Sequence, residues 1–218
     1  MKENLHVKYW FDTPIYISQI SEWVKPLNKV CNELIKETKT LNKNTIKNKE
    51  KILKKKLGDF GMSHHSKGLL FNNHFNEFQQ YVRERSIEVL NDMGYDLTHY
   101  NIALNELWVQ EFAKNGGGHH EGHVHYNSHL SGFYFLKCSD KTSYPIFHDP
   151  RVRKVMCDLP LKDKNVNSVG NSSAYYLPKP GNFIIFPAYL EHQFVLDSGI
   201  DPFRFIHFNV QALPKFIK

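Results

Sequence analysis

The sequence of 218 residues predicts a mainly β domain with helices in its N-terminal part. Before about residue 99, apolar residues recur at helical intervals. Beyond about Tyr100 they stand in short β-branched or aromatic runs, separated by Gly, Pro, Asn and Asp. Because no helical periodicity interrupts these runs, we expect an antiparallel sandwich or barrel with the helices packed outside it.

The helical part contains two periodic stretches. In the first, from Ile17 to about Leu57, apolar side chains form one stripe with polar residues between them. The second runs from Phe75 to Met93, and Gly94 suits its C-terminal cap. We expect both stretches to be helical and the second to cover a core.

Seven segments of the second part have the composition of strands. Each is rich in aromatic or β-branched residues and is bounded by turn-forming residues. They are ELWVQEF, HLSGFYFLK, YPIFHD, SAYYLP, GNFIIFP, HQFVL and FRFIHFNV. Since no linker or internal repeat divides the chain, we expect one domain over residues 1–218, in which a mostly helical layer at 1–99 supports a β core at 100–218.

Composition narrows the functional classes. Hydrophobic residues make up 41% of the chain, with 16 Phe and 11 Tyr, which is too aromatic for a disordered protein. The 3 cysteines have no paired spacing, so we expect neither a disulfide framework nor a thiolate zinc site, and a cytoplasmic location fits best. Nowhere do the roughly 18 consecutive apolar residues of a membrane span occur, so no membrane contact is expected.

The formal net charge of +6 would favour a polyanionic partner. Much of the excess lies in the lysine-rich residues 36–56. Because this run has almost no aromatic residues to stack on bases, we interpret it as the solvated face of a helix and its connecting loop. Nucleic-acid binding is the less favoured alternative.

Histidines give the strongest local signal. Five of the 13 fall in the stretch GGHHEGHVHYNSHLSG, between a glycine-rich loop and a predicted strand. Two residues separated by one position in an extended segment point to the same face, so His123 and His125 can bind one metal ion. Exposed loop histidines are the alternative interpretation.

An octahedral catalytic site needs a third protein ligand on the same face of the ion. His192 is the best candidate, because it opens a strand in the second half of the β region, where a folded-back strand could complete the pair. A structural histidine is the alternative. Other residues could also replace a ligand, namely the carboxylates of Glu121 and Asp149 or the imidazole of His129.

The order of these motifs resembles the 2-oxoglutarate- and iron(II)-dependent oxygenases of bacteria and phages. The resemblance is carried by HVHYNSHLSGFYFL, FHDPR, PGNFIIFPAYLEHQF, Arg204 and the terminal HFN, and the opening FDTPIY is similar as well. It implies a double-stranded β-helix (jelly roll, cupin-like) in which His123, His125 and His192 hold iron(II). Most members of the larger superfamily have a carboxylate where this chain has His125.

The resemblance also implies that Arg204 binds the distal carboxylate of 2-oxoglutarate. A guanidinium forms two parallel hydrogen bonds with a carboxylate and stays charged at every relevant pH. The hydroxyl of Tyr134 could donate to the same carboxylate, and Gln110 could line the pocket as a polar residue. Core packing is the alternative for Tyr134, and a surface position for Arg204.

We therefore expect a dioxygenase that uses iron(II), 2-oxoglutarate and dioxygen to hydroxylate a substrate, with release of succinate and carbon dioxide. The alternatives are a cupin-like three-histidine metalloenzyme that does not use 2-oxoglutarate, and a non-enzymatic binding module. As prime substrate we favour a protein side chain or a small metabolite over nucleic acid. For a phage-encoded protein, the expected location is the host cytoplasm.

Overall fold

The computed structural model describes residues 6–215. Its helices are α1 (Val24–Leu41), α2 (Lys43–Leu53) and α3 (Asn76–Asp92), with two short 3-10 helices, η1 (Asn73–Phe75) and η2 (Val152–Cys157). Its strands are β1 (Tyr16–Gln19), β2 (Ser63–His65), β3 (Tyr100–Phe112), β4 (His120–His123), β5 (Leu130–Lys137), β6 (Pro145–His148), β7 (Ser173–Tyr175), β8 (Asn182–Pro187), β9 (His192–Phe194) and β10 (Arg204–Pro214). Within the described residues, no helix has the length and apolar character that crossing a membrane requires.

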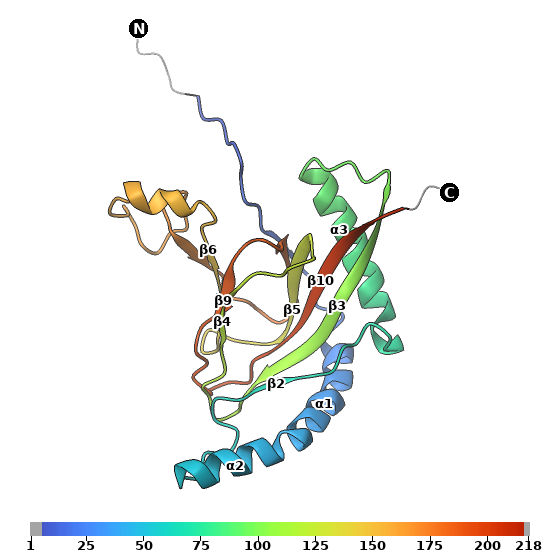
Figure 1. The fold of residues 1–218 in the computed structure, drawn as a ribbon, viewed down its shortest axis with the longest axis vertical. Coiled ribbons are helices and arrows are strands. Elements are labelled where there is room, and N and C mark those ends of the chain that lie inside the picture. Colours follow the sequence, from blue (N-terminus) through green and yellow to red (C-terminus); the bar gives the residue numbers. More distant parts are fainter. Residues whose placement is uncertain (1–5, 216–218) are drawn as a thin grey trace.

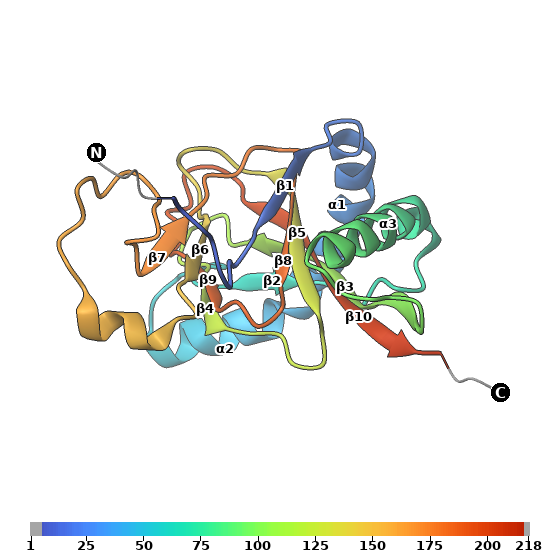
Figure 2. The same ribbon diagram turned by 90° about the horizontal axis from the view of Figure 1, so that it is seen from above.

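The strands form two antiparallel sheets, one large and one small (Figure 1). The large sheet has the order β1-β8-β5-β10-β3-β2, and the small sheet has the order β4-β9-β6-β7. Helices α1 and α3 lie on one side of the large sheet, and the small sheet lies on its other side (Figure 2). The predicted antiparallel β architecture with helices outside is thus confirmed.

Two apolar cores cover the two faces of the large sheet. Between this sheet and the helices, α1 and α3 bury side chains such as Cys31, Phe78 and Val82 against Tyr134 and Phe208. Between the two sheets lies a core made mainly of phenylalanine, which contains Phe112, Phe133, Phe135, Phe147, Phe186, Phe194, Phe203 and Phe205. Because side chains alternate along a strand, each position of the large sheet faces either the helices or the small sheet.

The N-terminal part differs from the prediction in two respects. The apolar period from Ile17 to Leu57 is not one helix, since it begins in strand β1 and is interrupted at Asn42, between α1 and α2. In addition, β1 and β2 form the two edges of the large sheet, so the residues before 100 contribute strands as well as helices. By contrast, α3 agrees with the prediction, and Gly94 follows it with φ +87°, in the left-handed region.

Candidate metal centre

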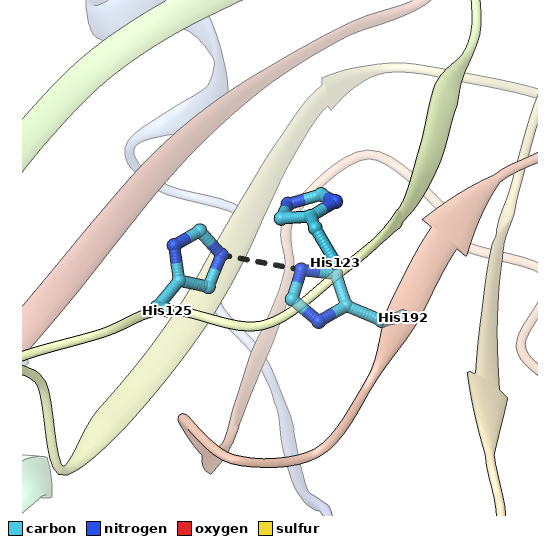
Figure 3. A group of neighbouring side chains, drawn as sticks. All are labelled: His123, His125 and His192. Carbon is cyan, nitrogen blue, oxygen red and sulfur yellow. Dashed lines mark hydrogen bonds between the residues drawn. The ribbon is translucent and has the colours of Figure 1, made fainter.

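The three predicted ligands lie together on the side of the large sheet that faces the small sheet (Figure 3). His123 ends β4 and is paired with His192, the first residue of β9. His125 follows β4, where its backbone N–H donates to the carbonyl of Ala188 at 3.0 Å. Strand pairing and one backbone hydrogen bond therefore hold the three side chains in place.

The spacing of the three imidazoles suits a metal ion. One ligand nitrogen of each lies within 4.8 Å of the others, and the Nε2 atoms of His125 and His192 are 3.3 Å apart. A metal–nitrogen bond of about 2.1 Å would separate two ligands at right angles by about 3 Å. The geometry of this histidine triad, His123, His125 and His192, thus fits one ion with little adjustment.

Backbone carbonyls orient two of the three rings. The Nδ1–H of His123 donates to the carbonyl of Glu121 at 2.7 Å, and the Nδ1–H of His192 donates to the carbonyl of Leu190 at 2.9 Å. Because a carbonyl only accepts, each neutral ring carries its proton on Nδ1. The Nε2 lone pair of each ring is therefore free to bind a metal ion.

Burial keeps His125 and His192 in the neutral form that binds metal. It lowers the pKa of His192 to about 3 and that of His125 to about 4, with the neighbouring histidines contributing in the same direction. Phenylalanine rings surround His192 and exclude water; the ring centroid of Phe186 lies 4.9 Å away and that of Phe133 lies 5.5 Å away. Since a metal ion binds neutral imidazole, these two side chains can accept one near neutral pH without first releasing protons.

Gln110 lies beside the triad. It is on β3, on the face directed toward the small sheet, where its amide nitrogen contacts Ser63 and His120. The ring of His120 is in turn 5.6 Å from that of His123. The Oε1 atom of Gln110 is buried and has no hydrogen-bond partner among the described residues. This side chain could therefore form a further hydrogen bond near the candidate site.

Arg204 points away from the triad, toward helix α1. Its Nε donates to Glu111 at 2.8 Å, and its Nη1 donates to Asn32 at 2.8 Å and to Asn28. On β10 it shares a face with Ile206 and Phe208, which belong to the helix-side core. The resemblance implied that this guanidinium binds the cosubstrate. The structure instead places it on the helix side of the sheet, away from the histidines.

Tyr134 lies on the same helix-side face. Its hydroxyl donates to the carbonyl of Ile20 at 2.6 Å, and its ring packs 5.4 Å from that of Phe78 on α3. The sequence did not reveal these orientations, because both faces of β5 and β10 are apolar and the pattern cannot tell which face meets the helices. Core packing, the alternative considered for Tyr134, is what the structure shows.

The alternative ligands also have other contacts. The carboxylate of Asp149 accepts two hydrogen bonds from the guanidinium of Arg151, at 2.9 and 2.8 Å. The Nδ1 of His129 accepts from the backbone N–H of Ala212 at 3.1 Å, and Glu121 contributes its carbonyl to the orientation of His123. None of these side chains is part of the group of potential ligands around His192 among the described residues.

Two further polar side chains near His125 were missed by sequence reasoning. A carboxylate oxygen of Glu106 and a ring nitrogen of His207 lie within 4.8 Å of each other and of a ring nitrogen of His125. His207 is buried in β10, and neither of its ring nitrogens has a partner among the described residues. A histidine in the otherwise apolar segment FRFIHF was the available signal, but a lone histidine in a strand more often packs than binds.

Sequence comparison matches the part of the chain that contains the candidate metal centre. Residues 106–205 match the sequence model of a family described as "Putative 2OG-Fe(II) oxygenase". No curated protein matches the chain. The matched segment contains the whole histidine triad and Gln110.

Several solved structures have a similar fold. EctD from S. alaskensis, solved with 2-oxoglutarate and 5-hydroxyectoine, has a TM-score of 0.58 at 11% identity, over 91% of this chain and 72% of that one. AviO1 from Streptomyces viridochromogenes has a TM-score of 0.55 at 11% identity, over 91% and 90%. A Pseudomonas putida prolyl-4-hydroxylase has a TM-score of 0.52 at 7% identity, over 90% and 92%.

Coverage of the matched structures varies. The chain spans 54% of an oxidoreductase of the 2OG-Fe(II) oxygenase family from Burkholderia pseudomallei and 58% of the epimerase SnoN, at TM-scores of 0.41 and 0.42. The three structures above share the double-stranded β-helix, so the predicted fold class is confirmed. The family resemblance inferred from the sequence is likewise confirmed over residues 106–205, the segment that matches the family model.

Proposed function

We propose that this chain holds iron(II) with His123, His125 and His192 and hydroxylates a substrate at the expense of 2-oxoglutarate and dioxygen. The observation that carries the proposal is the close spacing of these three imidazoles inside the segment that has the family's sequence pattern. In the overall reaction, one oxygen atom of dioxygen enters a C–H bond of the substrate. The other enters succinate as 2-oxoglutarate loses carbon dioxide.

The protein's own contribution is to orient ligands and exclude water. The histidine triad would hold the ion from one side and leave its other side open to the cosubstrate and dioxygen. The bound iron and its cosubstrate supply the oxygen chemistry. Phe133 and Phe186, which flank His192, keep the surroundings of the ion apolar and therefore protect it from competing reactions with water.

Gln110 is the residue that we assign to the polar end of the cosubstrate. A buried oxygen without a partner costs about 1–3 kcal/mol, so a ligand that pairs with this amide is favoured. The amide can present either its oxygen or its NH₂ group to a ligand. Arg204 has no part in this proposal, since its guanidinium is bound to Glu111 on the helix side of the sheet.

Anaerobic titration with iron(II) and 2-oxoglutarate tests the proposal. We expect a weak visible charge-transfer band when both are bound, and formation of succinate once dioxygen is admitted. Peptidyl proline and small metabolites are the first substrates to offer, because similar folds occur in a prolyl-4-hydroxylase and in a structure that contains 5-hydroxyectoine. The amount of succinate formed should rise in the presence of the true substrate.

His192→Ala provides the matched control for this titration. Loss of a direct ligand should weaken iron binding by more than the roughly 10- to 100-fold typical of an outer-shell partner, and the band should disappear. If wild-type protein binds iron through the histidine triad but gives neither the band nor succinate, the chain is a three-histidine metalloenzyme that does not use 2-oxoglutarate. If His192→Ala binds iron as wild type does, the triad is wrong.

A further inference from the structure

The ring of His125 has a second side that the triad does not use. Its Nε2 faces His192, whereas its Nδ1 points away from the other two histidines (Figure 3). The Nδ2 of Asn209, on β10, lies 3.0 Å from this Nδ1 and donates to Oε2 of Glu106, on β3, at 2.7 Å. Pairing of β3 with β10 holds Glu106 and Asn209 opposite each other, so their place beside His125 is fixed by the sheet.

Hydrogen bonds place the proton of the neutral His125 ring on Nε2. The Nδ1 of His192 donates to a backbone carbonyl, so its Nε2 is an acceptor, and the Nε2–H of His125 donates to it at 3.3 Å. The Nδ1 of His125 accepts from the amide of Asn209. In this arrangement the lone pair with which His125 binds a metal ion is directed toward Glu106 and away from His192.

Glu106 and another histidine complete a group of ligands on this side of the ring. A carboxylate oxygen of Glu106 and a ring nitrogen of His207 lie within 4.8 Å of each other and of a ring nitrogen of His125. Two imidazoles and one carboxylate are the ligand set of many non-haem iron sites, and imidazole also suits zinc, copper and nickel. The group therefore has the composition of a site for a divalent first-row metal ion.

Buried polar atoms in this group have no partner. His207 is 1% exposed, and neither of its ring nitrogens has a hydrogen bond to any of the described residues. The Oδ1 of Asn209 is likewise buried and unpaired among the described residues. Because an unpaired buried polar atom costs free energy, a ligand that engages these atoms is favoured.

Rotation of the Asn209 amide would bring its oxygen to such an ion. The rotation exchanges Oδ1 with Nδ2, which is 3.0 Å from Nδ1 of His125 and 2.7 Å from Oε2 of Glu106. Bonds of about 2.1 Å to a metal ion separate adjacent ligands at right angles by about 3 Å, so these spacings suit three ligands of one ion. Without a cation the turned amide would face two acceptors. The amide therefore turns only when an ion binds.

We propose a second divalent-cation site on the side of His125 opposite the triad. Its ligands are Glu106, His125, His207 and the amide oxygen of Asn209. Glu106 is exposed, so an ion can enter from solvent and keep water at its remaining positions. A neutral imidazole has one lone pair, which either nitrogen can carry, so His125 serves the triad or the second site but not both at once. The second site shares His125 with the proposed function and requires neither iron nor 2-oxoglutarate.

Removal of two triad ligands makes the second site measurable by itself. The metal-free double variant His123→Ala/His192→Ala keeps all four ligands of the second site, and we expect it to bind one cobalt(II) ion per chain, followed by visible absorbance. Its affinity should be below that of wild-type protein, because the amide of Asn209 must first turn. Glu106→Gln in this background removes a direct ligand and should weaken binding by more than the roughly 10- to 100-fold typical of an outer-shell partner.

Glu191→Gln in the double variant is the matched control. It removes the same charge from an exposed residue next to position 192 and should leave the affinity within about twofold, as expected for a screened surface charge. Asn209→Asp supplies a charged oxygen in place of the amide oxygen and should tighten cobalt(II) binding by about tenfold or more, because cation affinity depends on the number of charged ligands. If the double variant does not unfold cooperatively in urea, the larger replacement His192→Gln takes the place of His192→Ala.

Any of four results would overturn the second site. They are the absence of cobalt(II) binding by the folded double variant, an affinity that Glu106→Gln leaves unchanged, equal losses in Glu106→Gln and Glu191→Gln, and weaker binding in Asn209→Asp. None of these results bears on the triad, which the single variant His192→Ala tests separately. Conversely, if wild-type protein gives no charge-transfer band while the double variant binds cobalt(II) through Glu106, the proposed function fails and the second site stands.

Discussion

Gly132 is a position of the large sheet where a side chain has no room. A Cβ atom there would overlap the ring of Phe208 and the carbonyl oxygen of Ile184, which belong to the strands on either side of β5. The carbonyl is fixed by strand pairing, so it cannot move aside. Glycine at this position lets the ring of Phe208 lie across the sheet within the helix-side core.

Gly132→Ala should therefore be strongly destabilising. Overpacking against backbone typically costs about 1–3 kcal/mol, and we expect a loss of unfolding free energy in the upper part of that range. Gly68→Ala is the control, since a Cβ there meets nothing within 4 Å, and its effect should stay within about 0.5 kcal/mol. Urea unfolding of both variants measures the difference, and equal stabilities would contradict this account of Gly132.

At the scale of single residues, the sequence predicted which histidines lie together better than it predicted their surroundings. The HxH spacing and a distal histidine were sufficient to select three imidazoles that the fold brings together. The contacts of Glu106 and Asn209 with His125 could not be predicted, because they depend on which residues of β3 and β10 are opposite each other. That register includes an irregularity which no local pattern encodes.

The interface between β10 and α1 is organised around a buried carboxylate. Glu111 accepts from Arg204 and from Lys39, each at 2.6 Å, and Lys137 lies 3.8 Å away. Burial raises the pKa of Glu111, but Arg204 and Lys39 lower it more, so its pKa lies below the ordinary value. The carboxylate is thus ionised in the interior and depends on its cationic partners.

Arg204→Met should destabilise the protein and leave cobalt(II) binding intact. Removing one partner of a buried ion pair typically costs about 3–5 kcal/mol, because the remaining charge is left unpaired; Lys39 would reduce this cost. Urea unfolding measures the loss, and cobalt(II) titration verifies the metal centre. Unchanged stability with loss of 2-oxoglutarate binding would instead support the cosubstrate role that the family resemblance implied for Arg204.

Prediction of whole elements succeeded where a segment has the composition of a strand or a clear helical period. The seven expected strands correspond to β3 and β5 to β10, and the second expected helix to α3. Strands β2 and β4, with the sequences SHH and HEGH, contain no aromatic or β-branched run, and β1 lies at the start of the apolar period that was interpreted as helical. Because β4 ends at His123, a loop rather than strand alternation brings His125 to the other two ligands.

Across the whole molecule, the large sheet separates two kinds of chemistry. Its helix side carries apolar packing and the Glu111 ion pairs, and its other side carries aromatic rings and the histidine triad. Both sides are supplied by the same strands, and neighbouring residues such as Arg204 and Phe205 have opposite surroundings. A one-residue shift of β10 would therefore exchange the two environments, which is why the register of this central strand is under strong constraint.

His64 connects three parts of the molecule through its side chain. It lies on β2, is fully buried, and its Nε2–H donates to Asp59 at 3.2 Å, while Asn42 at the junction of α1 and α2 donates to its Nδ1 at 3.3 Å. Burial lowers the pKa of His64 and outweighs the opposing effect of Asp59. The folded protein therefore keeps this ring neutral at pH values where the unfolded chain takes up a proton.

The free energy of unfolding of the metal-free protein should consequently fall as the pH drops below about 6.5, the ordinary pKa of histidine. His64 alone contributes at most about 1.4 kcal/mol per pH unit to this slope, because one proton is taken up on unfolding. His64→Gln keeps a donor and an acceptor but does not titrate, so its stability should be lower at neutral pH and fall less steeply. Urea unfolding between about pH 7.5 and 5.5 compares the two proteins in the range where histidine titrates. Identical slopes would mean that His64 is protonated in the folded state as readily as in the unfolded chain.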